Sequence, residues 1–317
     1  MPILDGSDFN PPWMFKNGHV NSMYPYFLSS TKDPKFERER IETPDNDFLD
    51  LDFIRSGNQR LVLLCHGLEG SSDSNYIKHY ANHLDQQGYD VLAINYRGCS
   101  GEMNRQFLMY NSGKTDDLDW VIRHVLSDYD QIFLIGFSLG GNLILKYLGD
   151  GHFPISEKVK KAVAVSVPVH LSDASQQLLK PSNYLYQIKF LKTLRRKVRL
   201  KHRQFPDKID PKYLLKTWNL YLFDEYFTAP MFGYKNAEDY YAQNQSIQFL
   251  DGIQTPTLIV NAKDDPFLGP KCFPYEHAER SSTIQLCVPN YGGHVGFVKG
   301  SQDRKWLDDH IIRFFTA

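Results

Sequence analysis

The chain has 317 residues, of which 42% are hydrophobic and 23% charged, enough for one large domain or two smaller ones with a buried core. It carries 36 lysines plus arginines and 37 aspartates plus glutamates, for a formal net charge of −1. A general nucleic-acid-binding protein usually has a clear basic excess, so this balance argues against such a partner. No apolar run approaches the ~18 residues of a membrane span, and the mean hydropathy of −0.44 predicts a soluble protein.

The N-terminal residues and the cysteines bear on the cellular compartment. Residues 1–15 have neither a basic start nor an uninterrupted apolar stretch, so we expect no secretory signal. The four cysteines lie far apart and form no CxxC pair, which argues against a zinc or redox motif. Two of them, Cys65 and Cys287, lie in apolar runs and are expected in the core. We therefore expect a cytoplasmic protein.

In chain order, segments typical of strands alternate with segments typical of helices. Residues 48–54 alternate with a period of two, which predicts a half-buried antiparallel strand. Short continuous apolar runs predict strands covered on both faces, at 61–65, 91–95, 132–136, 162–167 and 257–261. Helix-like segments lie at 75–87, 115–128, 139–149 and 303–315. This order predicts an α/β fold, with a mostly parallel central sheet and helices on both faces.

The alternation stops once, after Pro168. About ninety residues, helical and aromatic in character, precede the next strand signal at Pro256. A structureless loop of that length would be implausible in a compact domain, so we expect a helical cap over one edge of the sheet. The predicted organisation is a single domain with a core at about 45–168 and 252–317, a cap at about 169–251, and an N-terminal segment, 1–44, that packs on the core.

The strongest functional signal is the sequence GFSLGG at residues 136–141. A G-x-S-x-G pentapeptide between a predicted strand and a predicted helix fits a nucleophile elbow, a sharp turn that exposes a serine hydroxyl. Gly136 and Gly140 would leave room for this backbone, because a Cβ atom there would collide with neighbouring chain. Ser138 would lie at a helix N-terminus, where free N–H groups and the helix dipole favour negative charge. We therefore expect Ser138 to be a nucleophile.

A serine nucleophile needs a base, and the base needs an orienting acid. In this type of fold the chain order is serine, acid, histidine. His294 follows the strand-like segment 283–288 within a glycine-rich loop and is the expected base. The acid is ambiguous, because Asp264 and Asp265 both follow the strand at 257–261. We prefer Asp265, since an Asp followed by Pro and an apolar residue is the usual form of this turn, and we expect Asp264 to cap the turn.

The oxyanion hole is expected in the segment CHGLEG at residues 65–70. This segment follows a predicted strand, so in a parallel sheet its backbone would lie beside the elbow. The N–H groups of Leu68 and Leu139 are the expected donors, and loss of one such donor typically costs ~2.7–4 kcal/mol of transition-state stabilisation. His66 comes too early in the chain order to be the base, and we expect it to brace the loop through a hydrogen bond.

Characteristic stretches extend from residue 11 to about 297. They are PPWMFKNGH, CHGLEGSSDSNY, NYRGCSGEMNR, GKTDDLDWV, GFSLGGNLILKYLG, SVPVHL, FDEYFTAPMFGY, DYYAQNQS, AKDDPF and GGHVGF. Together they resemble the α/β-hydrolase superfamily and, in detail, its YheT-like branch of esterases. The resemblance implies a serine hydrolase of carboxylic esters, with short- or medium-chain acyl groups or lipid esters as candidates. Carried over to this chain, the triad would be Ser138, Asp265 and His294.

Two alternatives to a hydrolase remain open from the sequence. The same triad would serve an acyltransferase in which an acceptor alcohol outcompetes water, and a catalytically silent protein could keep the fold as a binding module. The expected substrate of either enzyme is a small-molecule acyl ester. The triad chemistry needs neither a metal nor an organic cofactor.

Three further signals are weaker. NSGKT at 111–115 resembles the end of a phosphate loop, but Leu108 stands where that loop requires glycine. His79 and His83 stand four apart on a predicted helix without a third ligand nearby in the sequence, so we expect a surface pair rather than a metal site. The acidic residues that open the helix at 115–128 are expected to offset its dipole, since the spacing of a calcium loop is absent.

The basic residues are unevenly distributed. Residues 174–206 contain nine lysines or arginines and no aspartate or glutamate, and the densest part lies at 189–203 in the predicted cap. The apolar stripe in this segment, Ile188, Leu191, Leu194 and Val198, is expected in the core. One interpretation of the charges is a solvated helix face. The other is a basic amphipathic lid helix that contacts an anionic membrane or binds anionic groups of the substrate.

Overall fold

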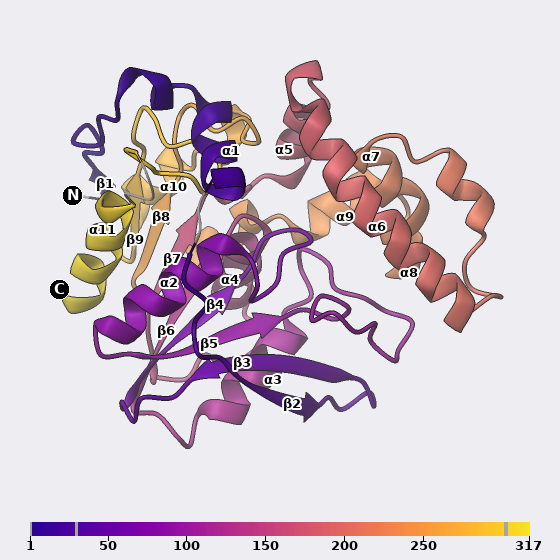
Figure 1. Cartoon of the computed structure of the whole chain (residues 1–317), viewed down its shortest axis with the longest axis horizontal. Coiled ribbons are helices and arrows are strands. Elements are labelled where there is room, and N and C mark those ends of the chain that lie inside the picture. The colour runs from indigo at the N-terminus through magenta and orange to yellow at the C-terminus, as the bar shows by residue number, and fades with distance from the viewer. Residues whose placement is uncertain (1, 29–30, 301–303) are drawn as a thin grey trace.

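The computed structural model describes residues 2–28, 31–300 and 304–317. Its centre is a nine-stranded sheet with the order β1-β9-β8-β7-β6-β4-β5-β3-β2 (Figure 1). All neighbours pair in parallel except the β3–β5 and β2–β3 pairs. The strands are β1 (Ile3–Leu4), β2 (Glu37–Glu42), β3 (Phe48–Ile54), β4 (Arg60–Cys65), β5 (Asp90–Asn95), β6 (Gln131–Phe137), β7 (Val159–Val165), β8 (Thr257–Val260) and β9 (Ile284–Cys287). The predicted mostly parallel sheet is confirmed.

Strand β3 is antiparallel, as its period of two predicts, but it is buried on both faces rather than half-buried. Its polar positions, Asp50 and Asp52, are covered by arginines of β2. Arg40 Nε lies 2.7 Å from Asp50 Oδ1, and Arg38 Nη2 lies 2.7 Å from Asp52 Oδ2. The expectation of a solvated face was therefore wrong, because the facing strand supplies the charges that a buried carboxylate requires.

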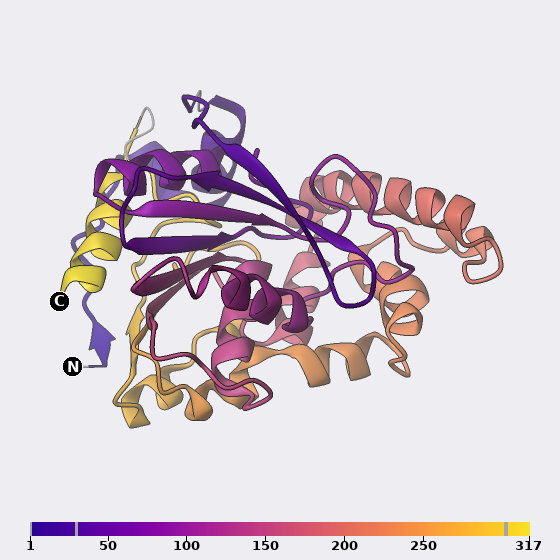
Figure 2. The same cartoon turned by 90° about the horizontal axis from the view of Figure 1, so that it is seen from below.

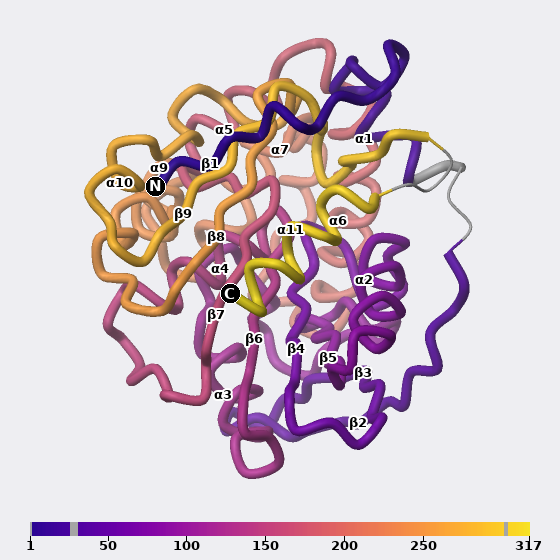
Figure 3. Tube along the Cα trace, turned by 90° about the vertical axis from the view of Figure 1, so that its left-hand side faces the viewer, coloured from indigo at the N-terminus to yellow at the C-terminus, as the bar shows by residue number. Residues whose placement is uncertain are grey.

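Helices cover both faces of the sheet (Figure 3). One face packs against α2 (Asn75–Gln86) and α11 (Lys305–Thr316), and the other against α3 (Asp116–Val125) and α4 (Leu139–Gly149). All four correspond to predicted helices, although the predicted start of the last one, residue 303, lies outside the described residues. Two further helices are α1 (Gly18–Leu28) and α10 (Tyr275–Arg280).

We call the sheet and the helices that cover it the α/β unit. Two buried cysteines and two N-terminal strands belong to it. The side chains of Cys65 and Cys287 are fully buried, as expected. The N-terminal segment adds β1 beside β9 and β2 beside β3, at opposite edges of the sheet. None of the helices in the described parts of the chain is long and apolar enough to cross a membrane.

The segment between β7 and β8 is helical and projects beyond the carboxyl ends of the strands (Figure 2). It contains α5 (Leu171–Leu178), α6 (Tyr184–Gln204), α7 (Leu220–Phe223), α8 (Ala229–Met231) and α9 (Ala237–Asn244). We call residues 169–251 the cap. A π-helical turn at Asp224–Thr228 connects α7 to α8.

The apolar stripe of α6 differs from the prediction at one position. Leu191, Leu194 and Val198 are buried, whereas Ile188 is 46% exposed. Gln187 takes the place in the stripe that was expected for Ile188, and its Nε2 donates to the backbone oxygen of Leu178 at 2.9 Å. A satisfied polar group can occupy a buried helix position, and the next residue then points about 100° further round the helix.

Candidate active site

The turn between β6 and α4 is a sharp elbow with Ser138 at its apex. Ser138 has φ 54° and ψ −120°, a backbone conformation that L-residues rarely adopt. The glycines on either side are sterically required. A Cβ atom on Gly136 would lie 2.4 Å from the carbonyl oxygen of Gly140, and one on Gly140 would lie 2.3 Å from that of Cys65. The predicted need for glycine at both positions is confirmed.

The carboxyl ends of β6, β8 and β9 bring together three predicted residues that are far apart in the chain. His294 Nε2 lies 2.9 Å from Ser138 Oγ. His294 Nδ1 lies 2.9 Å and 3.1 Å from the two carboxylate oxygens of Asp265. The Asp265 side chain is fully buried and that of His294 is 11% exposed. This geometry allows a proton on Nδ1 to be held by Asp265 while Nε2 accepts the serine proton.

Asp264, the alternative acid, has a different position. Its Oδ1 accepts the N–H of Gly293 at 2.9 Å, so it holds the loop that carries His294 rather than the imidazole itself. Its Oδ2 is buried, and no described residue offers it a hydrogen bond. Burial raises the pKa of Asp264 to about 6. The side chain is thus more than a cap for its own turn, because it connects the β8 and β9 loops.

Two serines and an aromatic ring that the sequence analysis did not single out position His294. The backbone N–H of His294 donates to Ser22 Oγ of α1 at 2.7 Å, and that of Val295 donates to Ser166 Oγ at 2.9 Å. The ring of Phe267 packs against the imidazole with centroids 4.1 Å apart. Ser22 is 272 residues from His294 in the chain, and no local pattern marks this contact.

The expected oxyanion loop lies beside the elbow and is held by two tyrosines. The N–H of Gly67 donates to the hydroxyl of Tyr76, and the N–H of Glu69 to that of Tyr110, both at 2.8 Å. Leu68 lies between these two anchored residues. No residue that the structure describes accepts a hydrogen bond from the N–H of Leu68 or of Leu139, so both donors are free, as an oxyanion hole requires.

His66 braces this loop, as expected. Its Nδ1 donates to the backbone oxygen of Gly67 at 2.7 Å, and its Nε2 accepts the N–H of Tyr96 at 3.4 Å. The side chain is fully buried, and this burial lowers the pKa of His66 to about 3. The ring is therefore neutral, and one nitrogen donates while the other accepts.

An ion pair between the cap and the oxyanion loop is a second feature that the sequence analysis missed. Lys197 Nζ of α6 lies 2.7 Å from Glu69 Oε1, and the hydroxyl of Tyr110 donates to the same oxygen at 2.8 Å. The side chain of Glu69 is 4% exposed, and its backbone has φ 54°. Lys197 belongs to the basic segment 189–203. The sequence alone does not show which lysines and arginines of this segment point toward the core and which point toward solvent.

A cavity lies between the elbow and the cap. It contains about 1140 Å³ of space not filled by atoms, part of it open to solvent. Ser138, His294 and Leu68 line it from the core. Mostly apolar side chains line it from the cap, among them Leu178, Phe190, Leu194, Phe223, Phe227 and Met231. Such a lining suits an extended apolar group.

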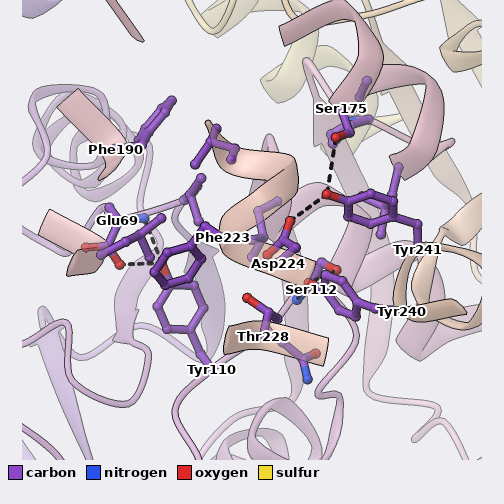
Figure 4. Close-up of a pocket in the computed structure, with 18 of the residues that line it drawn as sticks. Glu69, Tyr110, Ser112, Ser175, Phe190, Phe223, Asp224, Thr228, Tyr240 and Tyr241 are labelled. Carbon is purple, nitrogen blue, oxygen red and sulfur yellow. Dashed lines mark hydrogen bonds between the residues drawn. The ribbon is translucent and has the colours of Figure 1, made fainter. Parts of the chain in front are cut away.

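A polar cluster lines the same cavity (Figure 4). The hydroxyl of Tyr241 donates to Asp224 Oδ2 at 2.6 Å and accepts from Ser175 at 3.1 Å. Burial raises the pKa of Asp224 to about 6. Asp224 lies in the π-helical turn, a local irregularity often found at functional sites. These contacts connect three cap elements, α5, α9 and the turn between α7 and α8.

The weaker sequence signals have structural explanations. His79 Nε2 lies 3.0 Å from both carboxylate oxygens of Asp308, an acid 229 residues away in the sequence that the tertiary fold brings against α2. The described residues contain no group of three or more His, Cys, Asp or Glu side chains that could hold a metal ion. The aspartates that open α3 lie in its first turn, as expected, and Asp117 pairs with Arg97 at 2.8 Å.

Comparisons with known proteins identify the family of this chain. Residues 60–301 match the family model described as alpha/beta hydrolase fold. The chain belongs to the α/β-hydrolase superfamily. Within this superfamily it lies in the YheT-like branch. It is 32% identical to the "Putative esterase YheT" of Escherichia coli (strain K12), over 98% of this chain and 94% of that protein.

Other relatives of this α/β-hydrolase indicate an esterase- and lipase-type group. The chain is 31% identical to "Phospholipase ABHD3" of Bos taurus, over 100% of this chain and 80% of that protein. The Pyrococcus furiosus esterase Pf2001 superposes with a TM-score of 0.60 over 91% of this chain and 97% of that one. At 17% identity, the likeness to the Pyrococcus structure concerns the fold alone.

Proposed function

We propose that this protein is a serine hydrolase that cleaves carboxylic esters. The observation that carries the proposal is the unbroken path of hydrogen bonds from Ser138 Oγ through His294 to Asp265. In the first step Ser138 Oγ attacks the ester carbonyl while His294 takes its proton. The bond to the alcohol then breaks, and His294 protonates the leaving alcohol.

The acyl-enzyme is hydrolysed by the reverse sequence of proton transfers. His294 removes a proton from water, the hydroxide attacks the acyl carbonyl, and Ser138 leaves with the proton. The free N–H groups of Leu68 and Leu139 would stabilise the oxyanion in both steps. Asp265 holds the imidazole in the required tautomer and stabilises its charged form.

The lining of the cavity supports a substrate with an apolar acyl group, of short or medium length or in a lipid ester. Phe190, Leu194, Phe223 and Phe227 offer the acyl chain an apolar surface, and its burial provides binding energy. The relative named as a phospholipase supports the same substrate class. We place this activity in the cytoplasm, in keeping with four cysteines that stand as free thiols.

The test is Ser138→Ala assayed on p-nitrophenyl esters of increasing acyl length. Removal of a triad nucleophile can cost on the order of 10⁶ in rate, so we expect no turnover above background. Ser127→Ala, at an exposed position outside the site, is the matched control and should keep full activity. A fluorophosphonate probe should label the wild-type protein and not Ser138→Ala. Unchanged turnover by Ser138→Ala would overturn the proposal.

A further inference from the structure

Exposed apolar side chains gather in two segments of the chain. Of ten large apolar side chains that are exposed among the described residues, eight lie within 13–20 and 184–218. Trp13 is 84% exposed, Trp218 70% and Leu185 66%. Single exposed apolar residues are ordinary, but a concentration of them marks an interaction surface.

The two segments lie next to each other. The ring of His19 on α1 stacks on Tyr186 of α6 with centroids 5.8 Å apart. Ile188 and Trp218 line one hollow. We call the exposed apolar side chains of the two segments, Trp13, Met14, Val20, Leu185, Ile188 and Trp218, the apolar patch.

The apolar patch is close to the catalytic histidine. Tyr186 packs against Phe267 with ring centroids 4.7 Å apart, and Phe267 packs against His294 at 4.1 Å. The N–H of His294 also donates to α1, through Ser22. The elements that carry the patch therefore contact the site directly.

The structure divides the basic residues of α6 into two sets. Arg195, Lys197 and Lys201 turn inward, where Arg195 Nε donates to Thr217 Oγ1, Lys197 pairs with Glu69, and Lys201 Nζ donates to the backbone oxygen of Asn104. A second set is exposed and follows the helical spacing of one face, at Lys192, Arg196, Arg199 and Arg203. We call this second set the outward cations.

We propose that the apolar patch and the outward cations form a docking surface for an anionic lipid membrane. Indole rings and aliphatic side chains insert at the boundary between headgroups and acyl chains, and lysines and arginines attract anionic headgroups. The outward cations have no acidic neighbour anywhere in residues 174–206. A partner that is only acidic would account for the charges but not for the exposed apolar side chains of the same helix. The docking surface takes no part in the proposed ester hydrolysis. It gives the protein a membrane as an additional binding partner.

The test is co-sedimentation of the full chain with vesicles of phosphatidylcholine alone or of phosphatidylcholine mixed with phosphatidylserine. We expect binding to the mixed vesicles and little binding to phosphatidylcholine alone. Arg196→Glu with Arg199→Glu should weaken binding more than tenfold, since each charge near an anionic surface contributes about fivefold. Leu185→Ser with Trp218→Ser should also weaken binding to the mixed vesicles. The matched controls, Lys160→Glu and Tyr275→Ser, are exposed on other elements and should bind as wild type does.

Hydrolysis of a water-soluble ester, measured on every variant, shows whether the site is intact. Because co-sedimentation needs no turnover, an inactive protein that still binds vesicles would contradict the proposed function and leave the docking surface standing. Equal binding to both vesicle types, no binding to either, or equal losses in the variants and the controls would overturn the docking proposal. Binding to an acidic polypeptide but not to vesicles would do the same.

Discussion

Two regions meet at Ser138, and they are held in different ways. The loop after β9, which carries His294, is held by hydrogen bonds from the α/β unit. The N–H groups of residues 293 to 295 donate to Asp264, Ser22 and Ser166, all outside the cap. The oxyanion loop is instead fixed from both sides, by the core tyrosines and by Lys197 of the cap.

The loop of His294 and the oxyanion loop therefore depend on the cap to different degrees. The hydrogen bonds to the backbone of residues 293 to 295 come from outside the cap, whereas the loop of Asp265 also contacts it, since Asn183 donates to the backbone oxygen of Pro266 at 2.7 Å and Tyr186 packs on Phe267. The backbone at Leu68 depends on Glu69, and Glu69 depends on an ion pair that exists only when α6 lies over the core. A displacement of the cap would therefore break the ion pair of Glu69 but leave the hydrogen bonds to the backbone of residues 293 to 295 in place.

The largest expected effect concerns the core region. Asp265→Asn should lower kcat by roughly 10⁴, because an amide favours the wrong tautomer of His294. Asp264→Asn is the matched control at the neighbouring position and should lose less than about tenfold, since an amide oxygen can still accept the N–H of Gly293. Steady-state kinetics on one soluble ester measure both. If the two variants lost activity equally, the assignment of the acid would be wrong.

A smaller effect is expected at the contact between the cap and the oxyanion loop. Lys197→Met leaves the carboxylate of Glu69 buried without its cation. Since removing an oxyanion donor costs about 10²–10³ in kcat, its misplacement should cost roughly tenfold to a hundredfold. The loss should fall on kcat more than on KM, and Lys197→Arg should restore part of it.

Lys192→Met provides the control for this variant, because it removes a cation from the outward face of the same helix. It should leave the hydrolysis of a soluble ester unchanged. If Lys197→Met and Lys192→Met behaved alike, the cap would not position the oxyanion loop, and the comparison of the two regions would fail.

The smallest effect is one of stability, at Asp264. Burial raises the pKa of Asp264 to about 6, above the ~3.9 of an unfolded chain. Between these two values the folded protein keeps a proton that the unfolded chain has released, so the free energy of unfolding falls as the pH rises and then levels off above about 6. Asn does not titrate, so Asp264→Asn should gain roughly 1–2 kcal/mol relative to wild type across this window.

Denaturant unfolding of both proteins at pH values below, within and above the window measures this gain. The contribution of Asp224, whose pKa is also raised to about 6, is common to both chains and cancels in the difference. If the difference in unfolding free energy between Asp264→Asn and wild type did not change with pH, Asp264 would release its proton at the same pH in the folded and unfolded states. The prediction would then be wrong.

Local patterns were sufficient to predict much of the fold and the candidate nucleophile, base and acid. The apolar runs at 61–65 and 132–136 have no polar face to expose, so they predict buried parallel strands, and both are central in the sheet. The elbow is local as well, since the glycines around Ser138 relieve collisions within a few residues and with one neighbouring strand. The choice between Asp264 and Asp265 depended on a single turn pattern.

Long-range contacts were not predictable in this way. Nothing near His294 in the sequence indicates that Ser22 accepts its N–H, and nothing near Asp50 indicates that Arg40 covers it. Helix α6 is the clearest case, because its cations look alike in the sequence. Lys197 and Lys192 differ only in which side of the helix meets the core.

The sequence by itself therefore determined the alternating architecture and the position of the elbow, because both depend on short-range sterics and on hydrophobic periodicity. The candidates Asp265 and His294 followed from the chain order of this type of fold. The tertiary structure alone decided which charges of the cap are buried, which are exposed, and that a cap lysine holds the oxyanion loop. These depend on how helices pack against loops distant in the chain, and the free energy of a buried charge depends on the partner that packing provides.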